Sequence, residues 1–382
     1  MFLARIFNFG GAPAPAAVPS AEERFAVASQ LQLTWWRFRR HRLAVVSGVV
    51  VVLFYLVALF ADFLAYADPH DTASRRSYIP PQAVHLFDDG AFRPYVYGIT
   101  GKRDMRTFKI SYVADPNRKV YLQLFAEGYT YSFLGLFTTN RHLVGLVNPG
   151  PNDGIYVLGT DLLGRDLWAR SMVATRVSLT IGLCGVAVSL FLGVLLGGIS
   201  AIYGGIVDTV IQRIIEVIRS MPTIPLWMGL AAALPNTWSV LQISFALTVI
   251  ISLLGWTDLA RVVRGKFLAL REEEFVTAAE LAGAGQLRII FRHMLPSFLS
   301  HVIAATSLAL PAMIISETSL SFLGLGLRPP AVSWGILLQD AQNIETLALA
   351  PWLLAAAVPV IIVILAFNFL GDGLRDAADP YG

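Results

Sequence analysis

The sequence predicts an all-α polytopic membrane protein with six transmembrane helices and a small β-containing insertion outside the membrane, between the first two spans. Three observations support this fold class. The 382 residues are 55% hydrophobic and only 14% charged, too apolar for a soluble domain, in which about a quarter of residues are charged. Six apolar stretches are long enough to be spans. The polar region 67–157 separates the first from the second.

The first apolar stretch, Leu43 to Ala65, has 23 residues. A helix of that length is about 35 Å long, and a hydrocarbon core is about 30 Å thick. The third span is interrupted by Pro222 and Pro225, which are tolerated where neighbouring helices satisfy the freed carbonyl groups. The five further spans are predicted at Val177 to Ile202, Val217 to Leu234, Val240 to Trp256, Phe298 to Ile315 and Trp352 to Leu370.

Basic residues predict the orientation in the membrane. Ser20-Ala21-Glu22-Glu23 is typical of a capping box that opens a helix, and this helix runs through Trp35 and Trp36 to an arginine cluster. Aromatic residues followed by arginines indicate an interfacial helix at the cytoplasmic headgroups, so we expect a cytoplasmic amino terminus. Six crossings then return the carboxyl terminus to the cytoplasm. The arginines of the cluster are Arg37, Arg39, Arg40 and Arg42.

The connection between spans four and five agrees with this orientation. It is rich in basic residues, whereas the predicted outer turn "PNTW" between spans three and four has none. Basic residues near span ends favour the cytoplasmic side. The residues concerned are Arg261, Arg264, Lys266, Arg271, Arg288 and Arg292.

The insertion carries strand patterns. In "RTFKISYV" the apolar Phe108, Ile110 and Tyr112 alternate with polar residues, and "KVYLQLF" alternates similarly. Asp115-Pro116-Asn117 is predicted as the turn between them. "GITGKRD" lacks the glycine and the Ser or Thr that a phosphate loop needs, so it is interpreted as a surface turn.

The polar segment Thr277 to Pro296 lies between spans four and five. As a helix, its first half places Phe275, Ala278, Ala279 and Ala282 on one stripe. The second half repeats this spacing with Leu287, Ile290, Phe291 and Met294, and Gly283 and Gly285 allow a turn between the halves. This helix, turn, helix finger either packs against cytoplasmic ends of its own chain or docks on another protein. The pattern alone leaves both alternatives open.

The finger resembles the EAA loop of ATP-binding-cassette importer permeases, in which a coupling helix docks on the ATPase subunit. Ala278, Ala279, Gly283, Leu295 and Pro296 match that loop. Thr277 stands where the family usually has glutamate, with Glu274 and Glu280 one turn away on either side. The resemblance implies ATPase coupling through the loop 272–296, by Glu274, Phe275, Thr277, Ala278, Ala279, Glu280, Ala282, Gly283, Leu287, Arg288, Phe291, Leu295 and Pro296.

Three further segments resemble the C-type permease subunit of oligopeptide, dipeptide and nickel importers. They occur in the family's order: "LGTDLLGRDLWAR", "SETSLSFLGLGL" and "NFLGDGLRDAADP". The resemblance implies the type I importer architecture and the bacterial inner membrane. It implies as partners a second homologous permease, two ATPase subunits or domains, an extracytoplasmic solute-binding protein and the lipid bilayer. ATP and Mg would be bound by the ATPase partners, with no cofactor in this chain, and the transported solute would be a peptide, an oligosaccharide, an opine or nickel.

This interpretation divides the chain into five parts. They are a cytoplasmic tail with an interfacial helix (1–42), the first span (43–66), the extracytoplasmic insertion (67–157), a permease core (158–371) and a cytoplasmic tail (372–382). Typical relatives have a much shorter link in place of the insertion, so the resemblance assigns it no role.

Several polar residues remain open to two interpretations. Glu317, near the outer end of span five, is a candidate for the transport pathway or gate, or else a partner for backbone amides of the following turn. Asp161, Arg165 and Asp166 either brace an outer interfacial segment or contact a substrate-delivery protein. A polar helical side leading into span three is either a solvated, ion-paired face or part of the ATPase dock. Its residues are Asp208, Gln212, Arg213, Glu216 and Arg219.

Other function classes find little support. The six histidines lack metal-ligand spacing, the single Cys184 cannot form a disulfide within the chain, and serines in the spans have no identifiable base. We therefore expect no catalytic or metal site and no nucleic-acid partner. A membrane-anchored binding or scaffold protein whose outer domain supplies the activity is the chief alternative.

Overall fold

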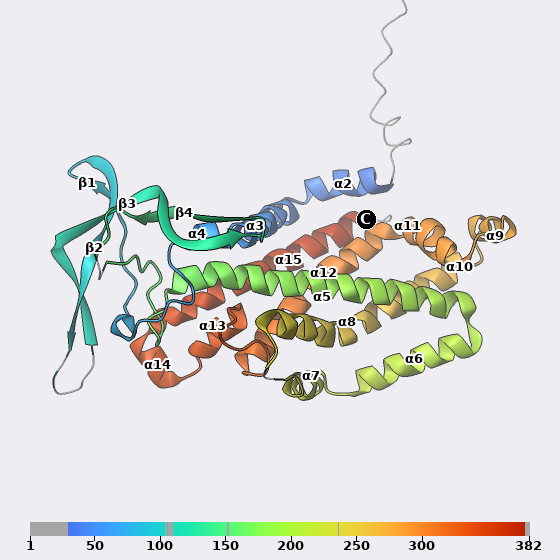
Figure 1. Cartoon of the computed structure of the whole chain (residues 1–382). Helices are drawn as coiled ribbons and strands as arrows, with labels where there is room; N and C mark the ends of the chain where they lie inside the picture. The colour runs from blue at the N-terminus through green and yellow to red at the C-terminus, as the bar shows by residue number, and fades with distance from the viewer. Residues whose placement is uncertain (1–29, 104, 106–109, 151–152, 236, 379–382) are drawn as a thin grey trace, which may run out of the picture.

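The structure, a computed structural model, describes residues 30–378 except 104, 106–109, 151–152 and 236. It is an elongated bundle of helices with a β-sheet at one end and the short helix α9 (Glu274–Leu281) at the other (Figure 1). The predicted capping box at Ser20 lies outside the described residues. Within them, five helices are long and apolar enough to cross a membrane.

The first predicted span is helical but is not one continuous helix. Helix α2 (Gln30–Arg40) ends in the arginine cluster, and His41 caps α3 (Arg42–Leu59) by accepting a hydrogen bond from the amide of Ala44 at 3.1 Å. Phe60 interrupts the helix before the short α4 (Ala61–Leu64). Helix α3 packs along α15 (Ala357–Ala378).

Helices α5 (Leu167–Tyr203) and α8 (Val240–Leu270) form the central pair of the bundle. Both extend well beyond the apolar stretches predicted for spans two and four, because polar residues at their ends continue the helices. Their close approach depends on small residues: a Cβ added at Gly197 would lie 2.5 Å from the carbonyl oxygen of Ala260. Small residues at such contacts are typical of membrane helices.

The third predicted span is two helices rather than one. Helix α6 (Gly205–Ser220) ends at Met221, and α7 (Thr223–Ala232) has only 10 residues. The break follows from Pro222, whose ring disfavours helical angles at the preceding residue; Met221 is extended, with φ −85° and ψ 140°. The predicted interruption by proline is therefore a complete break, and Val217 to Leu234 is not one helix.

The last two predicted spans are present with shifted bounds. The fifth, α12 (Leu299–Phe322), continues beyond the predicted end at Ile315. The sixth is a 3₁₀ turn, Pro351–Ala356, followed by α15. Between them lie α13 (Trp334–Asp340) and α14 (Ile344–Leu349). The buried indole of Trp334 lies in the main core, where α3, α5, α12, α13 and α15 meet.

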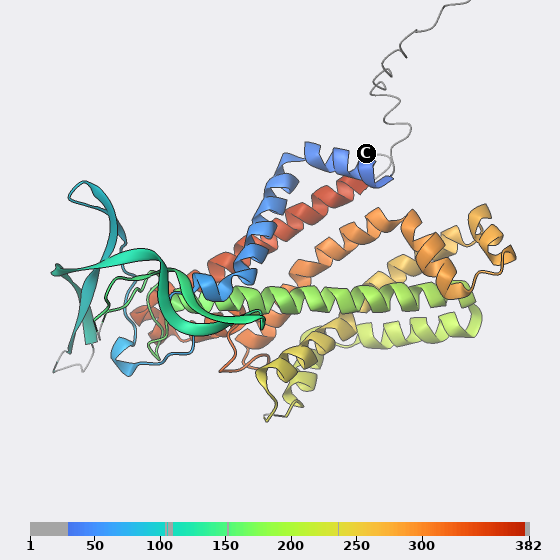
Figure 2. The ribbon, with the colours of Figure 1, turned by 45° about the horizontal axis from the view of Figure 1, so that its top comes forward.

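The insertion contains a four-stranded antiparallel sheet in the order β1-β2-β3-β4 (Figure 2). The sheet confirms the predicted β-structure, but two predicted turns are wrong. Asp115-Pro116-Asn117 lies within one long strand, and the register steps there from Tyr97↔Lys119 to Gly98↔Asp115. The extra residues form an irregularity in the ladder, which accommodates Pro116 because proline donates no ladder hydrogen bond. The strands are β1 (His85–Asp88), β2 (Ala91–Arg103), β3 (Ile110–Phe133) and β4 (Phe137–Leu146).

The segment interpreted as a surface turn, "GITGKRD", also belongs to the sheet as far as Arg103. Residues from Gly98 to Arg103 pair with β3 at the end of β2. Glycine is needed at 98 for space, since a Cβ there would lie 2.8 Å from the Cδ of Arg118. Composition suggested a turn because glycine is rare within strands except at close approaches.

Candidate functional site

The predicted finger protrudes at the end of the bundle opposite the sheet (Figure 1). It comprises α9, the short α10 (Gln286–Arg288), a single π-helical turn (Ile289–Met294) and α11 (Leu295–Ser297). The finger directly follows α8 and leads into α12. Any force on it therefore acts on both long helices.

The first half of the finger buries a narrower face than predicted. Val276 and Ala279 are buried, whereas Phe275, Ala278 and Ala282 are exposed. Only Ala279 of the predicted stripe thus faces the bundle. The buried residues keep the i, i+3 spacing, but the buried face begins one residue later than predicted, at Val276.

The second half is anchored more deeply. Ile289, Ile290 and Met294 are at most 1% exposed, and they pack with Phe267 of α8 and other residues at the ends of α5, α8 and α12. Leu287 and Phe291, which were predicted for the same seam, are instead 58% and 40% exposed. The finger is therefore fixed to the bundle by one face and presents another.

The turn between the two halves matches its prediction. Gly283 has φ +78°, its amide donates to the Glu280 carbonyl at 2.9 Å, and the amide of Ala284 donates to the Ala279 carbonyl at 3.0 Å. This pair of bonds is a Schellman motif, which ends a helix at a left-handed residue and favours glycine. Gly285 has φ −68° and needs no such freedom.

The outward surface of the finger combines apolar and charged side chains. We call Phe275, Leu281, Leu287 and Phe291 the apolar rim; Leu281 is 86% exposed. Glu274, Thr277, Glu280 and Arg288 are also exposed, and no ion pair joins them within the described part of the chain. Pro296 is exposed and Leu295 is half-buried. An apolar rim with charges beside it is suited to binding another protein.

Glu317 is far from the finger, within α12, and is 1% exposed. Its carboxylate accepts hydrogen bonds from the hydroxyls of Ser178 and Ser321, each at 2.9 Å. The Ser178 hydroxyl in turn accepts the amide of Trp334 at 3.2 Å. Glu317 thus joins α5, α12 and α13 through hydroxyl groups, not through the backbone amides that one sequence interpretation expected.

The neighbouring side chain, Ser316, lines a cavity of about 270 Å³ between α7, α8 and α12. Asp258 of α8 and Arg219 of α6 also line it, and they form an ion pair with each other. The Asp258 side chain is 76% exposed. Sequence analysis missed Asp258; the signal was a carboxylate in "WTDLAR" within an apolar helix, where ionisable residues mark functional sites by default.

The polar side predicted to lead into span three lies on α6, and ion pairs join it to α8. Asp208 accepts two hydrogen bonds from Arg264, at 2.5 and 2.6 Å, and Arg219 pairs with Asp258. Arg213 and Glu216 form a pair along the helix itself, at 2.7 Å. The expected solvated face is therefore partly an interface between α6 and α8.

The segment before α5 braces the end of the bundle that lies nearest the sheet. Asp161, 1% exposed, binds Arg165 at 2.7 Å and pairs with Arg170, which is fully buried. Arg170 also binds Asp340 at the end of α13, at 3.0 Å. These charges face one another rather than solvent, which favours the bracing interpretation over ligand contact.

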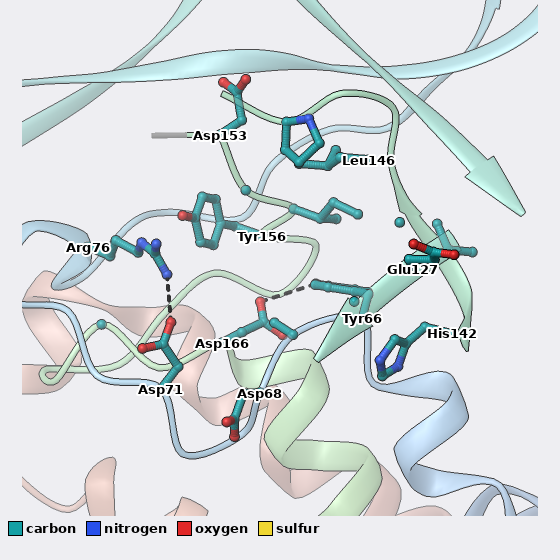
Figure 3. Close-up of a pocket in the computed structure, with 18 residues that line it drawn as sticks. Tyr66, Asp68, Asp71, Arg76, Glu127, His142, Leu146, Asp153, Tyr156 and Asp166 are labelled. Carbon is teal, nitrogen blue, oxygen red and sulfur yellow. Dashed lines mark hydrogen bonds and ion pairs between the residues drawn. The ribbon is translucent and has the colours of Figure 1, made fainter. Parts of the chain in front are cut away.

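Asp166 caps α5 and lines a pocket of about 240 Å³ at the sheet end of the bundle (Figure 3). It accepts the amide of Ala169 at 2.7 Å and the hydroxyl of Tyr66 at 3.1 Å. Burial raises the pKa of Asp166 to about 7, although these two hydrogen bonds act to lower the pKa. No group of three or more potential metal ligands occurs in the described residues.

Comparisons with known proteins agree with this architecture. The family described as binding-protein-dependent transport system inner membrane component matches residues 190–381, and the N-terminal TM domain of oligopeptide transport permease C matches residues 29–81. The sheet lies outside both matches. It has no counterpart in the matched regions, which agrees with the expectation that it is an insertion.

Individual relatives extend this result. The oligopeptide transport system permease protein OppC of Haemophilus influenzae is 38% identical over 60% of this chain and 71% of its own length. Proteins of the same name from Bacillus subtilis and Escherichia coli K12 are 34% identical over 68% of this chain and 80% of theirs, and 40% identical over 61% and 74%. The chain therefore belongs to the binding-protein-dependent transport system inner membrane component family, and it is a permease subunit of an ABC peptide importer.

Proposed function

We propose that the chain forms part of the peptide translocation pathway and receives its driving motion from separate ATPase subunits that bind the finger. The observation that carries this proposal is the division of the finger into two faces. Val276, Ile290 and Met294 fix it to the bundle, while the apolar rim is left exposed at the end of the molecule. Exposed apolar surface rimmed by polar groups marks protein interaction sites.

The mechanism is alternating access. Closure of the ATPases on nucleotide binding pulls the finger, and the tight packing of Ile290 and Met294 against Phe267 transmits this movement to α8 and α12. Ser316 and Asp258 lie on these two helices and line the same cavity, so their separation changes as the helices tilt. We propose that this cavity belongs to the peptide pathway, with Asp258 as a carboxylate that attracts cationic groups.

Glu317 takes a supporting role in this proposal. Because it is enclosed by Ser178 and Ser321 and is not among the residues that line the cavity, we propose that it holds α12 against α5 and α13 at the gate.

In addition to the five long apolar helices, we propose that α6 and α7 together form one further crossing of the membrane, the third along the chain, as a broken helix. The two return along α5 from the finger end toward the sheet end (Figures 1 and 2). Irregular backbone at membrane depth is tolerated where it is enclosed by protein or lines a cavity. Six crossings place both termini and the finger in the cytoplasm of a bacterial cell, and place the sheet outside.

The proposed assembly contains this chain, a second homologous permease, two ATPase subunits or domains and an extracytoplasmic solute-binding protein. ATP and Mg bind to the ATPase partners, and the chain itself holds no cofactor. Peptides are the proposed cargo, supported by relatives named oligopeptide transport permeases. Oligosaccharides, opines and nickel are the alternatives from the sequence.

Purification from native membranes with a cleavable tag on this chain tests the assembly. We expect two ATPase copies and one further permease to co-purify, with ATP hydrolysis stimulated by the peptide-loaded binding protein. Recovery of this chain without an ATPase, but with a ligand held by the outer domain, would instead support the membrane-anchored binding protein. Uptake by proteoliposomes of peptides, opines, oligosaccharides or nickel distinguishes the cargo classes.

A further inference from the structure

The hairpin between β3 and β4 ends in an apolar tip. Its residues are Phe133, Leu134, Gly135, Leu136 and Phe137, and we call them the hairpin tip. Leu134 is 48%, Leu136 77% and Phe137 58% exposed. A hairpin end that faces water normally carries polar turn residues, so this composition needs an explanation.

The backbone conformation of the hairpin tip is also unfavourable for Leu134. The turn is closed by the Leu136 amide, which donates to the Phe133 carbonyl at 2.9 Å, and Leu134 and Gly135 both have positive φ, 49° and 74°. Asn-Gly is the preferred pair for such a turn. A leucine in the left-handed region costs about 1–2 kcal/mol. Neither water nor the turn geometry favours Leu134, whereas an apolar environment does.

Polar groups along the hairpin are arranged in the order of a membrane interface. Residues 128–140 contain no Asp, Glu, Lys or Arg, and the first charges on either strand are Glu127 and Arg141, which pair at 2.9 Å and are mostly exposed. Tyr131, between this ion pair and the tip, is 9% exposed, and its hydroxyl donates to the Arg141 carbonyl at 2.9 Å. Charges are costly inside the hydrocarbon region, whereas apolar residues enter it readily, and the charge-free end of the hairpin fits that requirement.

Contacts with the helices give the direction of the hairpin. Phe125 on β3 lies 6.1 Å from Phe63 of α4, and Phe133 lies 5.7 Å from Phe60, as measured between ring centroids. Moving along β3 toward the tip therefore leads from α4 toward the end of α3. Both views show the hairpin folded back over the helices (Figures 1 and 2).

The depth of these contacts follows from the length of α3. Phe60 is eighteen residues beyond Arg42, the first residue of that helix, or about 27 Å along its axis, within the hydrocarbon thickness of about 30 Å. The exposed side of α3 there is apolar: Val52, Leu56 and Leu59 are 58%, 45% and 41% exposed. Because Phe133 contacts Phe60, the hairpin tip continues this exposed apolar surface.

We propose that the hairpin tip inserts into the membrane leaflet on the sheet side, where lipid acyl chains cover Leu134, Leu136 and Phe137. The sheet is then held to the bilayer by the hairpin as well as by the chain segments that join it to α4 and α5. Two attachments fix its position over the outer ends of the helices. This inference depends on the chain being a membrane protein and not on the ATPase coupling proposed above.

Depth-dependent fluorescence quenching tests the insertion. Leu136→Cys, in a Cys184→Ala background, is labelled with an environment-sensitive fluorophore, and the assembled transporter is placed in nanodiscs with a nitroxide on the lipid acyl chains near the headgroups. We expect a blue-shifted emission, most of which the nitroxide lipids quench. Val113→Cys is the matched control, because Val113 is 55% exposed on the strand pair that leads away from the helices. Its label should show an aqueous emission without lipid quenching.

A second variant tests whether the polarity of the hairpin tip controls insertion while the chain remains folded. Leu134→Asn retains a turn that accepts positive φ but makes the tip polar, so we expect weaker quenching of the label at 136 and an unchanged thermal unfolding midpoint. An aqueous emission from the label at 136 would overturn the proposal. A blue-shifted emission that nitroxide lipids do not quench would also overturn it, since this result would show that a protein partner covers the tip.

Discussion

Gly283 and Gly285 lie two residues apart in the same turn but differ in backbone conformation. Gly283 has φ +78° and Gly285 has φ −68°, and a Cβ added at either would meet no atom within 4 Å. Space is therefore equal at the two positions. Only conformational strain separates them, which makes them a matched pair for testing the finger.

We expect Gly283→Val to uncouple transport from ATP hydrolysis. A β-branched residue at positive φ is strongly disfavoured, at a cost of about 1–2 kcal/mol or more, so the turn shifts and the rim is misplaced. Transport per ATP hydrolysed in proteoliposomes measures the effect. Gly285→Val is the matched control and should retain normal coupling, because its φ of −68° accepts a side chain; equal losses for both variants would show that the left-handed turn is not the important feature.

Substitution of Glu317 distinguishes its two interpretations. Glu317→Gln retains hydrogen-bonding groups for Ser178 and Ser321, so a bracing role predicts normal stability and transport. Glu317→Ala leaves these buried hydroxyls without their acceptor, at a cost of about 1–3 kcal/mol. Thermal unfolding and uptake are measured on the same samples. A Gln variant that unfolds normally but transports poorly would instead support the pathway role.

The raised pKa of Asp166 predicts that the stability of the folded chain depends on pH. Its pKa is raised to about 7 by burial, so the folded chain holds this proton more tightly than the unfolded chain does. Stabilisation by the proton is complete below the ordinary pKa of about 4 and is lost as the pH rises through about 7. We expect the thermal unfolding midpoint to fall between pH 5 and pH 8.

Asp166→Asn is the control for this pH dependence. Asparagine also caps helices well but does not ionise, so the variant should lose much less stability over the same pH range. Equal pH dependence of the two chains would show that other groups are responsible.

At the scale of elements, the finger presents one face and buries another. Leu281 is 86% exposed on the presented face, whereas Val276 is 2% exposed on the buried face. A charge at Leu281 should therefore leave the chain folded and weaken only what binds the rim. We expect Leu281→Asp to reduce ATPase co-purification several-fold with an unchanged unfolding midpoint. Leu241→Asp, at a 79% exposed site at the start of α8, should leave co-purification unaffected; equal effects would contradict a specific role for the rim.

Element identity could be predicted from the sequence wherever hydropathy alone decides it. The apolar stretches from Leu43 and from Val240 are helices, and Gly283 is the left-handed turn residue that its position indicated. Pro222 was noticed, but hydropathy could not show that it ends one helix and begins another. The strand through Pro116 was missed because a local turn signal is strong, while the pairing that overrides it is long-range.

The site could be predicted only in part, for the same reason. Periodicity located the finger, yet which side of α9 faces the bundle depends on contacts with Phe267 and its neighbours, which are distant in sequence. Asp258 and Ser316 meet at one cavity although they belong to different helices. Pattern analysis follows one segment at a time and cannot bring such residues together.

At the scale of the whole molecule, the finger and the sheet occupy opposite ends of the bundle (Figure 1). Helix α5 runs along the bundle between these ends, whereas α8 and α12 extend from the finger end to α7 and α13 (Figure 1). In the proposed mechanism, a motor bound at the finger therefore changes the cavity lined by Asp258 and Ser316 without contacting it. This coupling requires that the ATPase bind at the finger end.

Site-directed cross-linking in the assembled transporter tests this requirement most directly. Cysteines replace Ala278 or Leu281 in a Cys184→Ala background, and a short bifunctional reagent joins them to the neighbouring subunit, which mass spectrometry identifies. We expect both positions to cross-link to the ATPase, with a yield that changes on ATP binding, and Val113→Cys on the sheet to give no ATPase product. Cross-links from Val113→Cys to the ATPase, with none from the finger, would contradict the account.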